Sequence, residues 1–319
     1  MSPRSPRSAS RTTRGSKHIP DQRTSLHDAI AAHVPDGSSV AIGCALEPAI
    51  PFAAVHELIR QRRVDLELIG PISDIAFDML IGAGCVATVH AAWVGNVSAG
   101  LAHCYRRATE QAVPRAIRVR DHSNFTMGLS LLAGALGAPY IPTRTLLGSD
   151  IPAANGTFIA ATSPLDDSPL LLIPAITPDV TILACQRADM DGNAHQWGPW
   201  GVSQEAALAA RNVIILADEI VDRSVIASDP NRTICPATKV AAVVEVAGAC
   251  HPSPLQGRYR RDHEFFHDYH RSTRDVEGFE RWIAEWVTGL PDHATYLRKL
   301  GDRWPKLREA GVPAAETRF

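Results

Sequence analysis

The chain has 319 residues, of which 45% are hydrophobic and 21% are charged, and its formal net charge is -2. These values are typical of a globular protein, and the length suffices for one large α/β domain or two small ones. A near-neutral chain without a basic face argues against nucleic acid as a partner. No apolar run approaches the ~18 residues of a membrane span, so we expect no membrane partner either.

Cysteine usage and the first residues bear on the compartment. The six cysteines are scattered and form no CxxC pair. This pattern indicates neither a zinc knuckle nor a redox dithiol, fits a reducing compartment, and favours a cytoplasmic location. Residues 1–22 are rich in Ser, Arg and Pro and have no apolar stretch. They are predicted to be a disordered tail, with a transit peptide as the alternative. Residues 23–319 are predicted to form a single domain.

Apolar periodicity in the first half predicts strands that alternate with helices. Ser25 and Asp28 cap a first helix whose inward face carries Leu26 and Ile30. The later elements, in chain order, are a strand at 38–42, a helix at 52–62, a strand at 64–69, a helix at 78–82, a strand at 86–93, a helix at 101–111, a strand at 116–119 and a helix at 124–136.

The second half continues this alternation. The expected elements are strands at 170–175 and 180–185, both apolar enough to be buried on two faces, a helix at 204–210, strands at 212–218 and 240–246, and helices over about 262–300. The alternation predicts an α/β fold with an open, mostly parallel sheet covered by helices. Residues 262–300 are then a C-terminal helical extension.

Two segments place possible anion-binding groups where a strand meets a helix. In Val40 to Pro51 the strand ends at Gly43 and turns toward a helix, which presents backbone N–H groups, although a plain βα turn explains it equally well. Near Asp121, a polar cluster opens an apolar helix, so the Asn124 amide lies at a helix N-terminus, where it is either a donor or only a cap. Gly148 supplies a further glycine turn downstream.

A third segment follows a buried strand. Asp189, Asp191 and Asn193 surround Gly192 and predict an Asx-type turn, which we expect at the carboxyl edge of the sheet, where such folds bind ligands. The later ligands of a calcium loop are missing, which argues against calcium.

A fourth segment contains HExxH from His263 to His267, with His270 on the same helical face. This spacing is the zincin arrangement. The helix is preceded by arginines and has a polar far side, so we interpret it as a surface helix and expect no metal site. Its aromatic residues are predicted to be packing anchors: Phe265, Phe266 and Tyr269.

Several of these segments together resemble one family. The runs Gly134 to Pro142, Leu147 to Asp150, Asp191 to Asn193 and Gly248 to Ser253 resemble the A-type subunits of family I CoA-transferases, most closely the glutaconate CoA-transferase A-subunit group. The resemblance spans about residues 24 to 301 in the same order.

The resemblance implies a fold shared with small sugar-phosphate isomerases and a partner subunit of the B type. In such enzymes a glutamate on the B half attacks the acyl-CoA thioester, a mixed anhydride and then a glutamyl-CoA thioester form, and coenzyme A passes to a carboxylic acid. Coenzyme A is therefore a substrate, and no cofactor is expected.

It also implies roles for residues of this chain. Asn124 is expected to donate to the thioester oxygen, and the backbone N–H groups of Gly43 and Cys44 to assist it. Four further positions are expected to line or shape the cleft: Ser73, Asp74, Gly148 and the turn Gly192-Asn193. Two departures stand out, since Cys44 follows Gly43 where the family has paired glycines, and Asn124 stands where many relatives have the longer glutamine.

Other functions remain open on the sequence alone. The same fold can hydrolyse an acyl-CoA or open a ring, for which Asp121 and Glu47 are the candidate bases in this chain. A non-enzymatic effector-sensing module would need a DNA-binding helix pair or basic face, and neither is apparent. The HExxH segment leaves a zinc protein as a further alternative.

Overall fold

The computed structural model describes residues 21–309, and its centre is a seven-stranded sheet in the order β12-β11-β8-β1-β2-β3-β4. Every neighbouring pair in this sheet is parallel, as expected from the alternation of strands and helices. Its strands are β1 (Ser39–Ala41), β2 (Leu66–Ile69), β3 (Val86–Ala91), β4 (Arg118–Asp121), β8 (Val180–Cys185), β11 (Asn212–Ala217) and β12 (Val240–Glu245).

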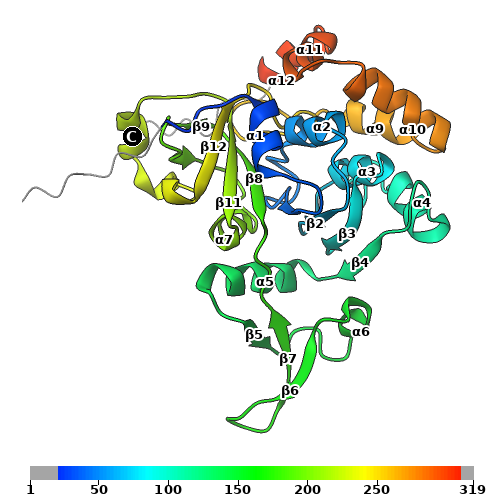
Figure 1. Cartoon of the computed structure of the whole chain (residues 1–319), viewed down its shortest axis with the longest axis vertical. Coiled ribbons are helices and arrows are strands. Elements are labelled where there is room, and N and C mark those ends of the chain that lie inside the picture. The colour runs from blue at the N-terminus through cyan, green and yellow to red at the C-terminus, as the bar shows by residue number, and fades with distance from the viewer. Residues whose placement is uncertain (1–20, 310–319) are drawn as a thin grey trace, which may run out of the picture.

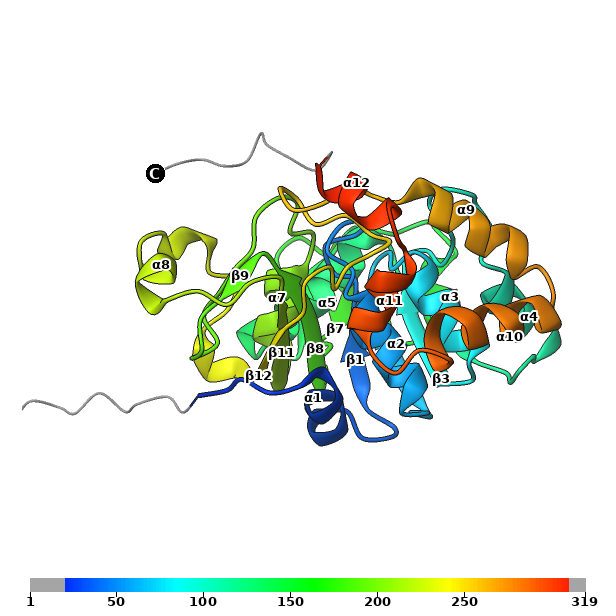
Figure 2. The same ribbon diagram turned by 90° about the horizontal axis from the view of Figure 1, so that it is seen from above.

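Helices cover both faces of this sheet (Figures 1 and 2). The helices of the described part are α1 (Leu26–His33), α2 (Phe52–Arg60), α3 (Ile75–Gly82), α4 (His103–Gln111), α5 (Asn124–Leu136), α6 (Ile151–Asn155), α7 (Ser203–Ala209), α8 (Arg223–Ala227), α9 (His263–Ser272), α10 (Val276–Ile283), α11 (His293–Lys299) and α12 (Arg303–Glu309), with short 3-10 helices at Pro230–Arg232 and Ala237–Lys239 and a π-helix at Ala284–Thr288. Alternation along β1 divides the core, because Val40 and Ile42 pack with α1 to α3 whereas Ala41 packs with α5 and α7.

The position of β1 determines where a ligand can enter. The chain runs from β1 through β2 and β3 to β4 on one side, then returns to place β8 on the other side of β1. The loops that follow β1 and β8 therefore leave the carboxyl edge in opposite directions. This is the topological switch point at which open α/β sheets bind ligands.

A second sheet projects from the first beyond α5 (Figure 1). It is antiparallel and three-stranded, in the order β5 (Tyr140–Thr143), β7 (Pro169–Pro174), β6 (Ile159–Thr162). The strand predicted at 170–175 lies here, so its assignment to the doubly buried parallel sheet was wrong. Leu171 and Ile173 are buried while their neighbours are partly exposed, as in a sheet covered on one face only.

The chain's first described residues pair with the edge of the main sheet. The Gln22 N–H donates to Met190 O, and Gln22 O accepts from the Val243 N–H. Gln22 therefore belongs to the folded part, and the predicted tail of residues 1–22 extends too far along the chain. Residues 1–20 lie outside the described part. A short hairpin of β9 (Arg187–Ala188) and β10 (Ala194–His195) lies beside this segment.

The C-terminal helices pack onto α2 to α4 and confirm the helical extension. Phe265, Phe266 and Tyr269 are buried, as predicted for packing anchors. The Tyr269 hydroxyl donates to Asp78 Oδ2 at 2.7 Å, and the Tyr105 N–H donates to Asp78 Oδ1 at 2.7 Å. Burial raises the pKa of Asp78, so these two donors satisfy a carboxyl that lies fully out of water.

Across residues 21–309, none of the helices combines the length and the apolar character that a membrane crossing requires.

We expect Tyr269→Phe to lower the free energy of unfolding by about 1–3 kcal/mol, because Asp78 loses a buried donor. Tyr105→Phe is the matched control, since no residue of the described part hydrogen-bonds its hydroxyl, and it should change stability by less than about 0.5 kcal/mol. Urea denaturation of the two variants measures the difference, and equal midpoints would contradict the role of the Tyr269–Asp78 bond.

Candidate active site

The candidate site lies at the carboxyl edge of the sheet, where three loops meet beside β1. The loop after β1 is held by the loop before α7, because the Val202 N–H donates to Cys44 O at 2.8 Å. It is also held by the loop after β12, because Ser253 Oγ donates to Glu47 O. Residues far apart in sequence thus fix the path of Gly43 to Ile50.

Close packing explains why glycine follows β1. Gly43 has φ +72°, and a Cβ on it would lie 2.7 Å from Ser73 Oγ. A Cβ on Gly70, after β2, would lie 2.4 Å from Ile42 O. The first two parallel strands therefore leave the sheet with their backbones in contact, and only glycine fits at these points.

Ser73 and Asp74, which were expected to line the cleft, hold this arrangement within the chain. Both side chains are buried, and Ser73 Oγ donates to Ile42 O at 2.9 Å. Asp74 has a strained backbone with φ +48°. Its carboxylate accepts from the N–H groups of Ile75 and Val97 and from the Arg261 guanidinium at 2.5 Å.

Arg261 is a site residue that sequence reasoning missed. Its side chain is only 9% exposed, lies over the Phe266 ring at 3.8 Å from the ring centre, and also donates to Ser98 Oγ. Burial raises the pKa of Asp74, whereas the ion pair with Arg261 and the two backbone bonds oppose that rise. No local signal identifies the pair, because the two residues are 187 positions apart.

The loop after β1 offers unused donors. No atom of residues 21–309 accepts a hydrogen bond from the backbone N–H of Gly43 or Cys44. The Cys44 side chain is not a nucleophile, because burial raises the pKa of its thiol to about 12. The group that Cys44 can offer a ligand is therefore its backbone N–H, and its role in binding stays a prediction.

Asn124 is the first residue of α5, a helix that packs against the loop after β1. Ser123, not Asn124, is the cap, since its hydroxyl accepts from the Thr126 N–H. The Asn124 side chain is exposed and has no hydrogen bond within the described part. One turn further, Met127 packs in a cluster with Cys44, and Gly128 approaches Val202, which binds the Cys44 carbonyl.

Three predicted positions lie elsewhere. Gly148 is exposed in the loop between β5 and α6, on the projecting part of the chain. Gly192 packs against Val240 at the amino end of β12, where an added Cβ would lie 2.8 Å from the Val240 Cβ. The neighbouring Asn193 amide is occupied by Asp189. The turn therefore does not lie at the carboxyl edge, because the β9–β10 hairpin folds back over the edge strand.

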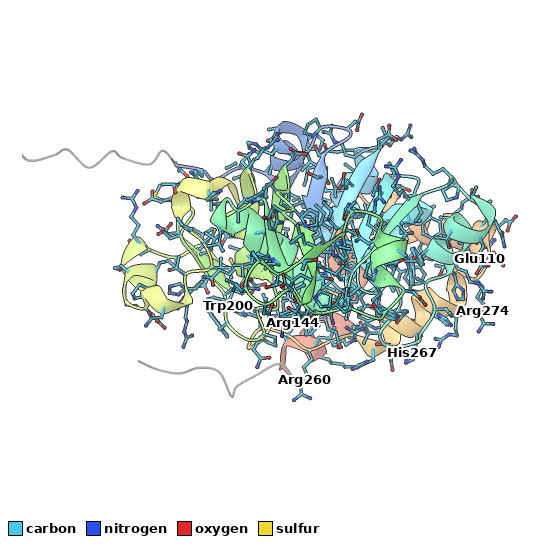
Figure 3. All side chains as sticks on the ribbon, turned by 90° about the horizontal axis from the view of Figure 1, so that it is seen from below. Glu110, Arg144, Trp200, Arg260, His267 and Arg274 are labelled. Carbon is cyan, nitrogen blue, oxygen red and sulfur yellow. The ribbon has the colours of Figure 1, made fainter. Side chains whose placement is uncertain are left out.

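The residues proposed for other chemistries are also dispersed. Glu47 is exposed in the loop after β1, and Asp121 ends β4. His267 lies at the surface of the helical extension, well separated from Trp200 of the loop before α7 (Figure 3). In residues 21–309 no group of three or more His, Cys, Asp or Glu side chains is placed to hold a metal ion.

Taken together, the described geometry suits recognition of a negatively charged oxygen. Two backbone N–H groups without acceptors in the described part lie at the switch point, and α5, a helix of 13 residues that begins with an exposed amide, packs against the same loop through Met127. Such preorganised donors stabilise an oxyanion without reorganising during the reaction. The described part of this edge holds no activated nucleophile.

Comparison with known proteins agrees with this geometry. A family model described as coenzyme A transferase matches residues 23–246. The chain is 37% identical to the A-type subunit of 3-oxoadipate CoA-transferase from Pseudomonas knackmussii, over 87% of this chain and 97% of the relative. It is 30% identical to the A-type subunit of glutaconate CoA-transferase from Acidaminococcus fermentans, over 86% and 91%. The crystal structure of that glutaconate enzyme superposes with a TM-score of 0.82, over 90% of this chain and 97% of that one.

We expect Arg261→Ala to lower the free energy of unfolding by about 3–5 kcal/mol, because it leaves the Asp74 carboxylate buried without its cation. Arg260→Ala is the matched control, because the Arg260 side chain projects from the surface (Figure 3). Its removal should lower the free energy of unfolding by less than about 0.5 kcal/mol. Chemical denaturation compares them. A double variant with Asp74→Asn should recover part of the loss, and a full loss in that variant would contradict the ion-pair explanation.

Proposed function

The chain belongs to the coenzyme A-transferase family, and we propose that it is the A-type subunit of a heteromeric enzyme that moves coenzyme A between an acyl-CoA thioester and a carboxylic acid. The observation that carries the proposal is the pair of free N–H groups at Gly43 and Cys44, on a loop that packs against α5, the helix that begins at the exposed Asn124. A B-type subunit completes the site, since two of the relatives are themselves named as subunits of the A type.

The reaction follows from this division of labour. The thioester carbonyl is attacked by a glutamate carboxylate of the B-type subunit, and the coenzyme A thiolate leaves as an anhydride forms. The thiolate then attacks the glutamyl carbonyl and releases the acid, which gives glutamyl-CoA. The acceptor acid repeats both steps in reverse order. Each step passes through a tetrahedral oxyanion, which Asn124 and the N–H groups of Gly43 and Cys44 stabilise.

Short dicarboxylic acids are the proposed substrate class. The relatives named above act on 3-oxoadipate and glutaconate, which are both dicarboxylates. Coenzyme A enters as a substrate, and no cofactor is proposed. The family and these names favour transfer over the hydrolase or ring-opening alternative.

The proposal is tested by incubating the co-purified complex of this chain and its B-type partner with acyl-CoA and an acceptor acid. The panel includes glutaconate and 3-oxoadipate. Mass spectrometry is expected to find the new acyl-CoA and a coenzyme A adduct on a glutamate of the B-type subunit, with none on this chain. Release of free coenzyme A without transfer or adduct would instead establish the hydrolase and direct attention to Asp121 and Glu47.

Asn124→Ala should lower kcat by ~100- to 1000-fold with a smaller change in KM, because an oxyanion donor acts mainly in the transition state. Asn231→Ala is the control, since Asn231 is also an exposed asparagine and lies in the 3-10 helix Pro230–Arg232. Steady-state kinetics of the two complexes measures the effect. Near-normal turnover of Asn124→Ala would remove this residue from the mechanism.

A further inference from the structure

Helix α5 carries no charged residue along its 13 positions. Its inner face packs on the main sheet and on α7 through Met127 and Leu131, which belong to the same hydrophobic cluster as Cys44 and Ile69. A helix that is apolar on every side is normally buried on every side. The described part of the chain covers only the inner side of α5, so the opposite side is left without a cover.

Four side chains form an apolar stripe along this uncovered side. They are Phe125, Leu129, Leu132 and Leu136, spaced by four, three and four residues. At about 100° per residue, this spacing places all four within about 60° of one another and opposite Met127. Phe125 is 58% exposed and Leu136 is 69% exposed, and none of the four belongs to a hydrophobic cluster in residues 21–309. The stripe therefore faces away from the core of this chain.

A second apolar surface adjoins the end of the stripe, because only three residues separate Leu136 from β5 in the projecting sheet (Figure 1). One face of that sheet carries the buried Leu171. The opposite face carries Leu172, with Pro142 of β5 and Ile159 of β6 directly opposite it in the ladder, and Ile159 is 58% exposed. Strand alternation adds further uncharged side chains to this face: Tyr140, Ala161 and Leu170.

We propose that the stripe of α5 and this face of the projecting sheet form the surface on which the B-type subunit docks, through an apolar surface of its own. The inference rests on the proposed function, which requires such a subunit. Monomeric proteins rarely expose contiguous apolar surfaces of this extent, and their burial is the main driving force of protein association. Recognition here depends on apolar area and shape, since neither the stripe nor the sheet face offers a charge.

The position of the stripe selects the B-type subunit over a second copy of this chain. Phe125 directly follows Asn124, so a chain that covers the stripe also lies beside the candidate oxyanion donor. The described part of the carboxyl edge holds no activated nucleophile, and a second copy would bring none to it. A B-type subunit bound on this surface would instead bring its glutamate toward the donors.

Leu136→Lys and Ile159→Lys test the two parts of the surface. Both wild-type side chains are exposed in the single chain, and a lysine in the last turn of α5 suits the helix dipole, so we expect the variants to fold. In the complex each lysine would be buried without a partner, and the dissociation constant for the B-type subunit should rise by ~100-fold or more. Sedimentation velocity of the co-purified complexes, diluted through a concentration series, measures this change.

Val64→Lys is the matched control. Val64 is also an exposed hydrophobic residue, at 40%, but it precedes β2 and lies outside the proposed surface. This variant should change the dissociation constant by less than about 2-fold. Urea denaturation of each full-length variant checks that the chain itself has kept its stability.

Wild-type affinity in both lysine variants would overturn the inference, whereas the adduct experiment on the same complex would still report on the transferase. A complex that both variants dissociate but that only hydrolyses acyl-CoA would leave the inference standing and overturn the transferase proposal. Absence of any complex between the wild-type chains would overturn both. If this chain alone dimerises, and Leu136→Lys abolishes the dimer while keeping its affinity for the B-type subunit, the surface belongs to a second copy.

Discussion

The arrangement of this molecule depends on how tightly the ends of β1 and β2 approach each other. Neither Gly43 nor Gly70 can carry a Cβ, and the Ser73 hydroxyl fills the remaining space between the two backbones. A backbone that turns so sharply cannot satisfy its own N–H groups, and this leaves donors at the switch point. The free donors of the candidate oxyanion site therefore result from the close packing of the two strand ends, and they lie beside β8, at the switch point.

A second constraint is the fixed direction of α5. Its cap at Ser123 and its left-handed Gly137 set its two ends, and its inner face packs on the sheet and on α7. One helix therefore has two contacts with the sheet, because its first turn packs against the loop after β1 through Met127 while its middle roofs a separate cavity through Ser130. A row of contacting side chains, Glu67, His90 and His122, ties the strand before this helix to the strands beside it, so the roof and the wall of the cavity are positioned together.

The features of the fold that depend on neighbouring residues in the sequence could be predicted from the sequence alone. The helix over 124–136 has the expected bounds because a Ser-x-x-Thr cap and a glycine mark its ends. The glycine after β1 was likewise identified from the strand that precedes it. Pairing partners are not local, so the apolar run at 170–175 was placed in the wrong sheet. The Gly192 turn was misplaced because nothing in its composition shows that the following hairpin folds back. The Asp74–Arg261 pair and the row of Glu67, His90 and His122 exist only once distant strands are adjacent.

The ion pair between Asp74 and Arg261 has a consequence for biosynthesis. The two partners are separated by 187 positions, so Asp74 has left the ribosome long before its cation is made. Until then the strained turn after β2 lacks the contact that offsets its burial, and the edge of the sheet that carries the free N–H groups is not yet settled. Synthesis of the segment that carries Arg261, just before α9, is therefore needed before this edge of the sheet has all its contacts. A nascent chain that stops short of Arg261 keeps the Asp74 carboxylate without its cation, so the fold is expected to close at this edge only late in synthesis.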